Sequence, residues 1–440
     1  MNDLKKGKLI AEGKTKKLYQ AKGNVRLLIV KSKDDITKND DPSQTRVMEK
    51  KAAHSTATTC AVFSLLKKAE LPVAYEDRLS ETEFLAVNCQ MIQLEVVVRR
   101  YAVGSYLKRF PNLEKKKSES PHRFHRLVFE LFLKTTGGKI IKKDGQEWGE
   151  TAEDHKTGRL IDDPFIANSY DDVWQLKHPK IPEWEKGSDI LQHVLKSDFL
   201  PEGITVEKIE EIARKVFLVL EGAWAQLGFR FVDFKIELGI DQDENLLVTD
   251  VIDNDSWRLR TNDWQELSKQ LFRDNFDMSE IADKYALVAN LVGRFSIPKQ
   301  AVVLWRGSKD DKLPELPELA GVARVDIVKS GHKSPGACIS ALEEVLAAYP
   351  EGGIIIALVG KSNGLGPTLA ARTSWPVISV PLTAKDRPHD VWSSLEMPSY
   401  VPSTTVLSPD NAILAALNIL AQKNPAAYMF RQYAIEELDK

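Results

Sequence analysis

At 440 residues the chain is longer than one hydrophobic core of ordinary size, so two or more domains are expected. Its composition, 43% hydrophobic and 28% charged, argues against extensive disorder. A formal net charge of −2 excludes a global basic field for nucleic acid or membranes, and three cysteines without a CxxC pair fit neither a zinc site nor a disulfide framework. With a polar N-terminal segment and no long apolar run, these features predict a cytoplasmic protein with no membrane or nucleic-acid partner.

The first part of the chain is predicted to be mixed α and β structure. Short β-branched runs bounded by glycine and polar turns predict strands, and a further Gly-containing hairpin is expected over 139–149. Apolar residues at helical spacing predict helices, with Thr205 as the cap of the second. The expected strands cover residues 8–10, 15–20, 25–31, 84–100, 231–238 and 245–251, with 84–100 expected to form paired strands. The expected helices cover 48–69, 204–227 and 262–291.

The pattern of apolar and polar residues changes from residue 297. Four short, nearly all-apolar runs over 301–304, 322–328, 353–358 and 376–380 alternate with helical stretches. That alternation is typical of a parallel sheet covered on both faces, and such folds bind ligands in the loops after the strands. We therefore expect a first domain over 1–262, a helical connector over 263–298 and a second domain over 299–440.

Two motifs in the first part could bind phosphate. Lys14 and Lys16 follow Gly13 and share one face of a strand, although the spacing is not that of a P-loop and solvated lysines are the plainer alternative. An apolar strand then carries Arg99 into the turn at Ser105, where arginine could grip phosphate or carboxylate and backbone amides could assist. A solvated surface hairpin is the alternative reading of this second motif.

A third motif gathers carboxylates. Asp233, Lys235 and Glu237 alternate along one strand face, and the next strand ends at Asp250. Hairpin pairing would bring Glu237 close to Asp250, which suits Mg²⁺ bound to a nucleotide. An exposed acidic turn is the alternative, but it does not explain the apolar residues between the charges.

These three motifs, in this order, resemble SAICAR synthetase over about residues 8–262. The resemblance implies an α+β fold with a kinase-like ATP cleft. It implies a ligase that phosphorylates the carboxylate of carboxyaminoimidazole ribonucleotide with ATP and then joins L-aspartate to it. Carried over by position, the implied roles are ATP binding for Lys14, Lys16 and Met91, Mg²⁺ binding for Glu237 and Asp250, a catalytic role for Lys235, and ribonucleotide binding for Arg99, Ser105 and Arg258.

Three loops follow the apolar strands of the second part. The first carries Arg306-Gly307-Ser308, which could cradle a phosphate, and the second carries His332, a candidate acid or base that could equally be structural. The third, residues 360–367, has three glycines and a serine but no GxGxxG spacing, which disfavours a dinucleotide.

The loops resemble the animal-type carboxylase that makes carboxyaminoimidazole ribonucleotide from aminoimidazole ribonucleotide and CO₂ without ATP or biotin, over about residues 300–425. The stretches SNGLGP, WPVISVP and STTVLSP strengthen the match. The fold implied is a three-layer, flavodoxin-like parallel α/β domain, and the family implies a homo-octamer. The implied site residues are His332 for proton transfer, Asp311 at the ribose or ring edge, and substrate contacts from Ser308, Lys333, Ser362, Asn363 and Gly364.

One departure from this second family bears on function. Asp310 stands where the family has a serine, which places an anion where phosphate should bind. Two alternatives to the two-enzyme interpretation therefore stay open. One is an active ligase fused to a carboxylase-like domain that only assembles or regulates, and the other is a kinase-like enzyme fused to a flavodoxin-like binding module.

Overall fold

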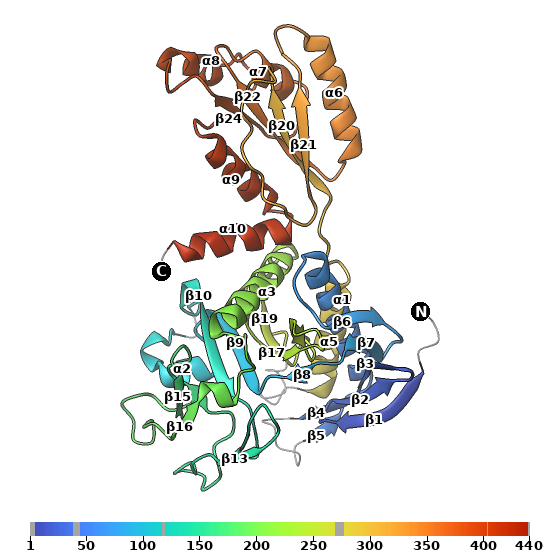
Figure 1. Ribbon diagram of the computed structural model, residues 1–440, viewed down its shortest axis with the longest axis vertical. Coiled ribbons are helices and arrows are strands. Elements are labelled where there is room, and N and C mark those ends of the chain that lie inside the picture. Colours follow the sequence, from blue (N-terminus) through green and yellow to red (C-terminus); the bar gives the residue numbers. More distant parts are fainter. Residues whose placement is uncertain (1–4, 38–44, 117–118, 269–276, 403, 439–440) are drawn as a thin grey trace. The chain divides into compact units, whose positions relative to one another are not determined.

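The computed structural model describes residues 5–37, 45–116, 119–268, 277–402 and 404–438, and it divides into two compact units. The first unit comprises Met1–Phe295 together with Glu436–Lys440, and the second comprises Ser296–Ile435. The second unit therefore interrupts the first in chain order. Figure 1 colours the chain along its length, so the last residues of the first unit appear in red.

The first unit begins with a five-stranded antiparallel sheet in the order β1-β2-β3-β7-β6. Helix α1 packs against it, and the apolar side chains Phe63, Leu66 and Leu85 are buried there. The helix starts later than predicted because Lys50 has a left-handed backbone with a φ of 65°. The bounds are Lys6–Glu12 for β1, Lys16–Ala21 for β2, Asn24–Ser32 for β3, Lys51–Lys68 for α1, Tyr75–Arg78 for β6 and Glu83–Val87 for β7.

A nine-stranded sheet forms the rest of this unit, with β9 and β17 paired antiparallel at its centre. The prediction that residues 84–100 form paired strands is wrong. Their first strand, β7, joins the small sheet, whereas their last, β9, pairs with β10 and β17. The strands are β8 Gln90–Met91, β9 Leu94–Tyr101, β10 Arg123–Leu133, β14 Phe165–Ile166, β15 Val173–Lys177, β16 Gln192–Leu195, β17 Phe229–Ile240, β18 Leu246–Thr249 and β19 Trp257–Thr261.

Two further helices, α3 and α5, belong to the first unit. Helix α3, Val206–Gln226, begins at Thr205 as predicted, whose side chain accepts a hydrogen bond from the Lys208 amide at 3.2 Å. Helix α5, Met278–Val292, packs against α1 and is grouped with the first unit rather than standing apart as a connector.

The expected helix over 262–291 is wrong for residues 262–268, which are not helical. The Thr261 hydroxyl accepts from the Gln265 amide at 3.0 Å, and Trp264 has a φ of 67°. Such local side-chain bonds favour a turn over a helix. Residues 269–276 of that prediction lie outside the described part of the chain.

The remaining small elements of the first unit include the hairpin predicted over 139–149. Its strands β12 and β13 pair antiparallel, with β11 beside β12. Strands β4 and β5 form a separate two-stranded sheet, and α2 is a single short helix after β9. Their bounds are Asp35–Thr37 for β4, Thr45–Val47 for β5, Ser105–Arg109 for α2, Thr135–Thr136 for β11, Lys139–Ile141 for β12 and Glu147–Glu150 for β13.

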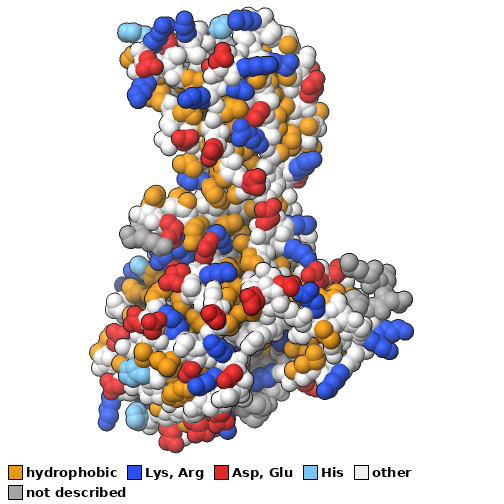
Figure 2. All heavy atoms as spheres, in the orientation of Figure 1, with side chains coloured by type: hydrophobic (Ala, Val, Ile, Leu, Met, Phe, Trp, Pro, Cys, Tyr) orange, Lys and Arg blue, Asp and Glu red, His pale blue; other side chains and the backbone are white. Residues whose placement is uncertain are grey.

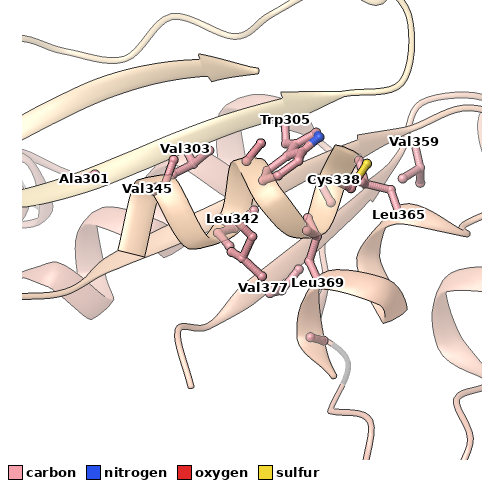
Figure 3. Close-up of a cluster of buried hydrophobic side chains, with 14 residues drawn as sticks. Ala301, Val303, Trp305, Cys338, Leu342, Val345, Val359, Leu365, Leu369 and Val377 are labelled. Carbon is pink, nitrogen blue, oxygen red and sulfur yellow. The ribbon is translucent and has the colours of Figure 1, made fainter. Parts of the chain in front are cut away.

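The second unit is a five-stranded parallel sheet in the order β21-β20-β22-β23-β24, as the apolar runs predicted. Alternate side chains of β20 enter opposite cores: Val303 and Trp305 meet α6 and α7 (Figure 3), whereas Val302 and Leu304 meet α9. Helices thus cover both faces, which is a three-layer α/β fold. The elements are β20 Gln300–Arg306, β21 Val322–Val328, α6 Pro335–Ala348, β22 Gly353–Val359, α7 Leu365–Ala370, β23 Val377–Pro381, α8 Trp392–Leu395, β24 Thr404–Thr405, α9 Pro409–Leu420 and α10 Pro425–Glu437, and the last two residues of α10 are grouped with the first unit.

The surface carries charges of both signs. On the face drawn in Figure 2, Lys and Arg are interspersed with Asp and Glu, in keeping with the net charge of −2. Among the described residues, no helix is both long and apolar enough to cross a membrane.

Candidate active sites

Two carboxylates meet two lysines at one end of the β17–β18 hairpin. Glu237 pairs with Thr249 across the hairpin, so the next residue, Asp250, lies beside it, as the sequence predicted. The Lys16 ammonium contacts Asp250, and the Lys134 ammonium contacts Glu237. All four side chains keep some exposure, between 15% and 36%, so a ligand in solution can reach them.

Lys16 is the residue of the phosphate motif whose ammonium group contacts Asp250. Burial lowers the pKa of Lys16 to about 8, while Glu237 works in the opposite direction. The ammonium form therefore still prevails at neutral pH. Lys14 lies exposed in the turn before β2, and Met91 is half-buried in β8, where it pairs with Gly239 of β17.

The Glu237 and Asp250 pair fits a Mg²⁺ ion that also binds phosphate. Mg²⁺ usually takes one or two protein carboxylates and completes its shell with water and phosphate oxygens. Among the described residues, no cluster of three or more His, Cys, Asp or Glu could hold a metal by itself. Lysine ammonium groups already lie against both carboxylates, so this corner accepts positive charge.

A second cluster lies where β9, β17 and β19 run side by side. Arg99 pairs with Asp233 across the sheet, contacts its carboxylate, and donates to Ser105 Oγ at 3.1 Å. Arg258 Nη1 lies 2.5 Å from the same Asp233 carboxylate. The predicted residues Arg99, Ser105 and Arg258 therefore come together, and Asp233 orients both guanidinium groups.

Arg99 and Arg258 differ in how far their side chains are exposed to solvent. The Arg99 side chain is 4% exposed and the Arg258 side chain is 18% exposed. Glu130 accepts from Arg99 Nε at 2.6 Å and also contacts Arg109, whose pKa burial lowers to about 9. Arg258 is therefore the more accessible group for an anion, while Arg99 is held firmly behind it.

Gly104 keeps the space in front of Arg258 open. Its φ is +61°, a left-handed conformation that disfavours side chains. A Cβ at this position would lie 2.5 Å from Arg258 Nη2. The Gly-Ser turn that the sequence singled out is thus required both for the backbone course and for the position of the guanidinium.

Sequence reasoning missed three residues around Lys235 and Glu237. The Lys235 ammonium pairs with Glu95 of β9, and Lys134 pairs with Glu237. Asp163 interacts electrostatically with both Glu95 and Lys235. Burial, together with Glu95, raises the pKa of Asp163 to about 6. The doubled aspartate before Pro164 was the available signal, but such pairs are common in loops.

In the second unit, the predicted residues lie in three loops at the carboxyl end of the parallel sheet. Strand β20 lies between β21 and β22, so its loop is the middle one. The Ser308 amide donates to Asp311 Oδ2 at 3.0 Å, and the Ser308 hydroxyl lies 3.3 Å from Asp310 Oδ2. Asp310 therefore stands directly beside the serine expected to bind phosphate.

The second and third loops touch one another through His332. Its Nε2 lies 3.3 Å from the Ser362 carbonyl oxygen, and a Cβ on Gly364 would overlap the imidazole ring. His332 and Lys333 are exposed, so both can reach a ligand. The glycine at 364 is needed for the histidine to occupy this place.

Asn363 is built into the loop itself. Its side-chain amide donates to Ser379 Oγ at 2.8 Å and Ser394 Oγ at 3.0 Å, and its Oδ1 accepts from the Gly366 amide at 2.7 Å. The side chain is buried and both of its N–H donors are used. The main-chain N–H also donates to Ser393 Oγ at 3.0 Å, so the N–H groups of this residue are already bonded within the protein.

In comparison with known proteins, each part of the chain matches the model of a protein family. The family model for SAICAR synthetase matches residues 9–144 and 192–289, and the model for AIR carboxylase matches residues 312–435. The probable multifunctional protein ADE2 of Caenorhabditis elegans is 33% identical over 94% of this chain and 90% of its own length. The bifunctional phosphoribosylaminoimidazole carboxylase/phosphoribosylaminoimidazole succinocarboxamide synthetase of Homo sapiens is 31% identical over 95% of this chain and 91% of its own.

A solved structure also aligns with the first part of the chain. Phosphoribosylaminoimidazole-succinocarboxamide synthase from Ehrlichia chaffeensis covers 66% of this chain and 100% of its own, with a TM-score of 0.47 and 20% identity.

The fold and the two sites define a two-domain enzyme with a ligase unit and a lyase unit. The chain belongs to the family of bifunctional AIR carboxylases/SAICAR synthetases of purine biosynthesis.

Proposed function

We propose that the chain catalyses two reactions of purine synthesis in sequence. The second unit joins CO₂ to aminoimidazole ribonucleotide, and the first unit couples the carboxylated product to L-aspartate with ATP. The main support is the cluster of Arg99, Ser105 and Arg258 beside a separate lysine–carboxylate corner, which provides one place for a ribonucleotide and another for ATP phosphates.

In the ligase reaction, a substrate carboxylate oxygen attacks the γ-phosphorus of ATP, and ADP leaves. The aspartate amine then attacks the acyl phosphate, and inorganic phosphate leaves as the amide bond forms and the amine nitrogen releases a proton to solvent. Arg258 and Ser105 hold the ribonucleotide, and Arg99 is kept behind them by Asp233. Bidentate guanidinium contacts fix such an anion in position before reaction. Holding the reacting groups in the right geometry lowers the barrier to their reaction.

The lysines serve the phosphate side of the ligase. Lys14 and Lys16 balance the charge of ATP, and Met91 packs against its base from β8. Glu237 and Asp250 would hold Mg²⁺, which when bound neutralises charge on the transferring phosphoryl group. Lys235 lies beside Glu95 and Asp163, where its ammonium stabilises negative charge that develops during acyl transfer.

In the carboxylase reaction, the enamine-like imidazole carbon attacks CO₂, a carbon–carbon bond forms, and the ring proton departs. His332 takes that proton, since it is exposed and oriented by the contact with loop 360–364. Ser308 and Asp311 hold the phosphate and ribose side, while Lys333 and Ser362 flank the CO₂. The comparisons with known proteins do not favour an impaired carboxylase-like domain.

Two assays test the proposal. Aminoimidazole ribonucleotide with bicarbonate and no ATP should give the carboxylated product, and adding ATP, Mg²⁺ and aspartate should then give SAICAR. Glu237→Gln should abolish only the second step, His332→Asn only the first, and the exposed control Glu147→Gln should change neither. If the unaltered chain makes no carboxylated product, the second unit is not a carboxylase and the function is ligation alone.

A homo-octamer built by the second unit and a cytoplasmic location are part of the same proposal. The hollow of about 300 Å³ lined by Leu316, Ile413, Leu414 and Phe430 offers an apolar surface for a second copy. The location stays a prediction.

A further inference from the structure

Four charged side chains form a buried cluster in the first unit. Arg100 belongs to β9, Arg214 and Glu221 belong to α3, and Glu436 is near the end of the chain. Arg100 Nη2 lies 2.7 Å from Glu436 Oε1, and Arg214 Nη2 lies 2.9 Å from Glu436 Oε2. Glu221 lies 2.7 Å from Arg100 Nε. The Arg100, Arg214 and Glu436 side chains are at most 1% exposed.

These four side chains comprise two guanidinium groups and two carboxylates, and Arg214 also contacts Glu437 and lies 3.6 Å from Glu210. Burial disfavours the ionised Glu436 carboxylate, but Arg100 and Arg214 outweigh it and lower its pKa. Glu436 is therefore ionised at neutral pH. Removing one partner of a buried ion pair leaves an uncompensated charge, which is far more disruptive than losing a surface pair.

The cluster lies at an irregularity in the sheet. The β9–β10 ladder is regular up to the Arg99–Val128 pair and resumes only at the Tyr101–Arg123 pair. Four residues of β10 therefore face Arg100 alone, and their backbone groups cannot all bond to β9.

The cluster supplies some of the missing hydrogen bonds. Arg100 Nη1 donates to the His125 carbonyl at 2.6 Å, and the Leu127 amide donates to Glu436 Oε2 at 3.1 Å. Buried backbone groups need such partners, so these side chains fix the course of β10 through the bulge.

This bulge is directly behind the proposed ribonucleotide site. Arg99 and Arg100 are successive residues of one strand, so their side chains point to opposite faces of the sheet. Arg99 contacts Asp233 and Ser105 on the front, while Arg100 contacts Glu436 at the back. A shift of β9 at Arg100 must also move Arg99.

We propose that Glu436 is a positioning residue of the ligase, which holds β9 and bulged β10 so that Arg99 keeps its place behind Ser105 and Arg258, the residues that meet the ribonucleotide. It acts through Arg100 and touches no substrate. The inference rests on the proposed function of the first unit, and it makes the last residues of the chain necessary for ligation.

The test uses the full chain with Glu436→Gln and the matched control Glu437→Gln. Glu437 also contacts Arg214, but its side chain is 24% exposed. For Glu436→Gln we expect the ligase KM for carboxyaminoimidazole ribonucleotide to rise at least tenfold. Its KM for ATP should stay within twofold, and ATP-free carboxylation should be unchanged. Glu437→Gln should change each constant less than twofold.

Glu436→Asp covers the case in which Glu436→Gln does not fold. It keeps the charge but shortens the side chain, so the ribonucleotide KM should rise severalfold in a folded chain. An unchanged ribonucleotide KM in Glu436→Gln, or in Glu436→Asp if only that variant folds, would overturn the inference. An equal rise in both KM values would also overturn it, because it would indicate general loosening of the unit. Failure of the proposed function would instead show as no SAICAR from the unaltered chain.

Discussion

Gly104 controls the place of the Arg258 guanidinium, and it can be tested directly. Gly104→Ala should reduce ligase kcat/KM at least a hundredfold, because the new Cβ would lie 2.5 Å from Arg258 Nη2. Carboxylation should be unaffected. Steady-state kinetics of both reactions on one preparation measures the effect.

Gly23→Ala is the control for backbone strain. Gly23 has a φ of +83°, but a Cβ there would meet nothing within 4 Å. A positive φ strains an added side chain at both positions, and only at Gly104 would the new Cβ also clash with Arg258. Equal losses of ligation in the two variants would show that strain, and not the position of Arg258, limits the reaction.

Asp310 is the second residue whose side chain bears on a site. Its carboxylate lies beside Ser308, where the ribonucleotide phosphate should bind. Two anions a few ångströms apart repel by roughly 1–4 kcal/mol, so Asp310→Ser should tighten binding of aminoimidazole ribonucleotide about tenfold or more. Calorimetric titration measures this, and Asp326→Ser, an exposed carboxylate on β21, is the control. Weaker binding in Asp310→Ser would identify Asp310 as a ligand of the substrate.

At the scale of elements, the junction of β10 with β14 contains a carboxyl that opposes folding at neutral pH. Asp163 accepts a hydrogen bond from the Thr135 amide at 2.8 Å, and Phe132 pairs with Phe165 beside it. The pKa of Asp163 is raised to about 6, mainly by burial, so between about pH 4 and 6 the folded state keeps a proton that the unfolded chain releases, and above that range the folded state holds a buried carboxylate. Its contribution to the free energy of unfolding therefore falls as the pH rises from about 4 to 6.

Asp163→Asn should remove this dependence. At pH 7.5 we expect it to stabilise the first unit by about 1–2 kcal/mol, less than the full pKa difference implies because the group is partly hydrated. Near pH 4 the difference should vanish. Urea unfolding at several pH values measures it, with Asp144→Asn in an exposed turn as the control. A stabilisation that is equal at pH 4 and 7.5 would contradict the assignment.

Local sequence patterns were sufficient for many elements but not for the contacts between them. The apolar runs predicted the parallel sheet because their alternation is a local property, and the spacing in β17 and β18 predicted that Glu237 and Asp250 would lie together. The pairing of Lys134 with Glu237 was beyond reach, since the two residues are 103 positions apart. Arg100 could not be separated from Arg99, because only the fold shows that Arg99 meets Asp233 and Ser105 on one face of the sheet while Arg100 meets Glu436 on the other.

At the scale of the whole molecule, helix α9 leaves apolar side chains uncovered. Leu414 and Ile419 are 37% and 38% exposed, and Leu414 lines the hollow of the second unit. We expect the chain to be a homo-oligomer in which this surface is buried. Leu414→Glu should lower the mass measured by light scattering at micromolar concentration, whereas Gln422→Glu should not. A monomeric mass for the unaltered chain would refute this.

Because the first unit ends with residues that follow the second unit, its folding on the ribosome has a fixed order. Residues 296–435, 140 in all, must be translated between Phe295 and Glu436. At typical synthesis rates this takes roughly 7–28 seconds. During that interval Arg100 and Arg214 have no Glu436 carboxylate to pair with, because that residue has not yet been synthesised. A prematurely terminated chain can therefore contain every residue proposed to bind ribonucleotide and ATP in the ligase and still lack the Glu436 ion pairs with Arg100 and Arg214.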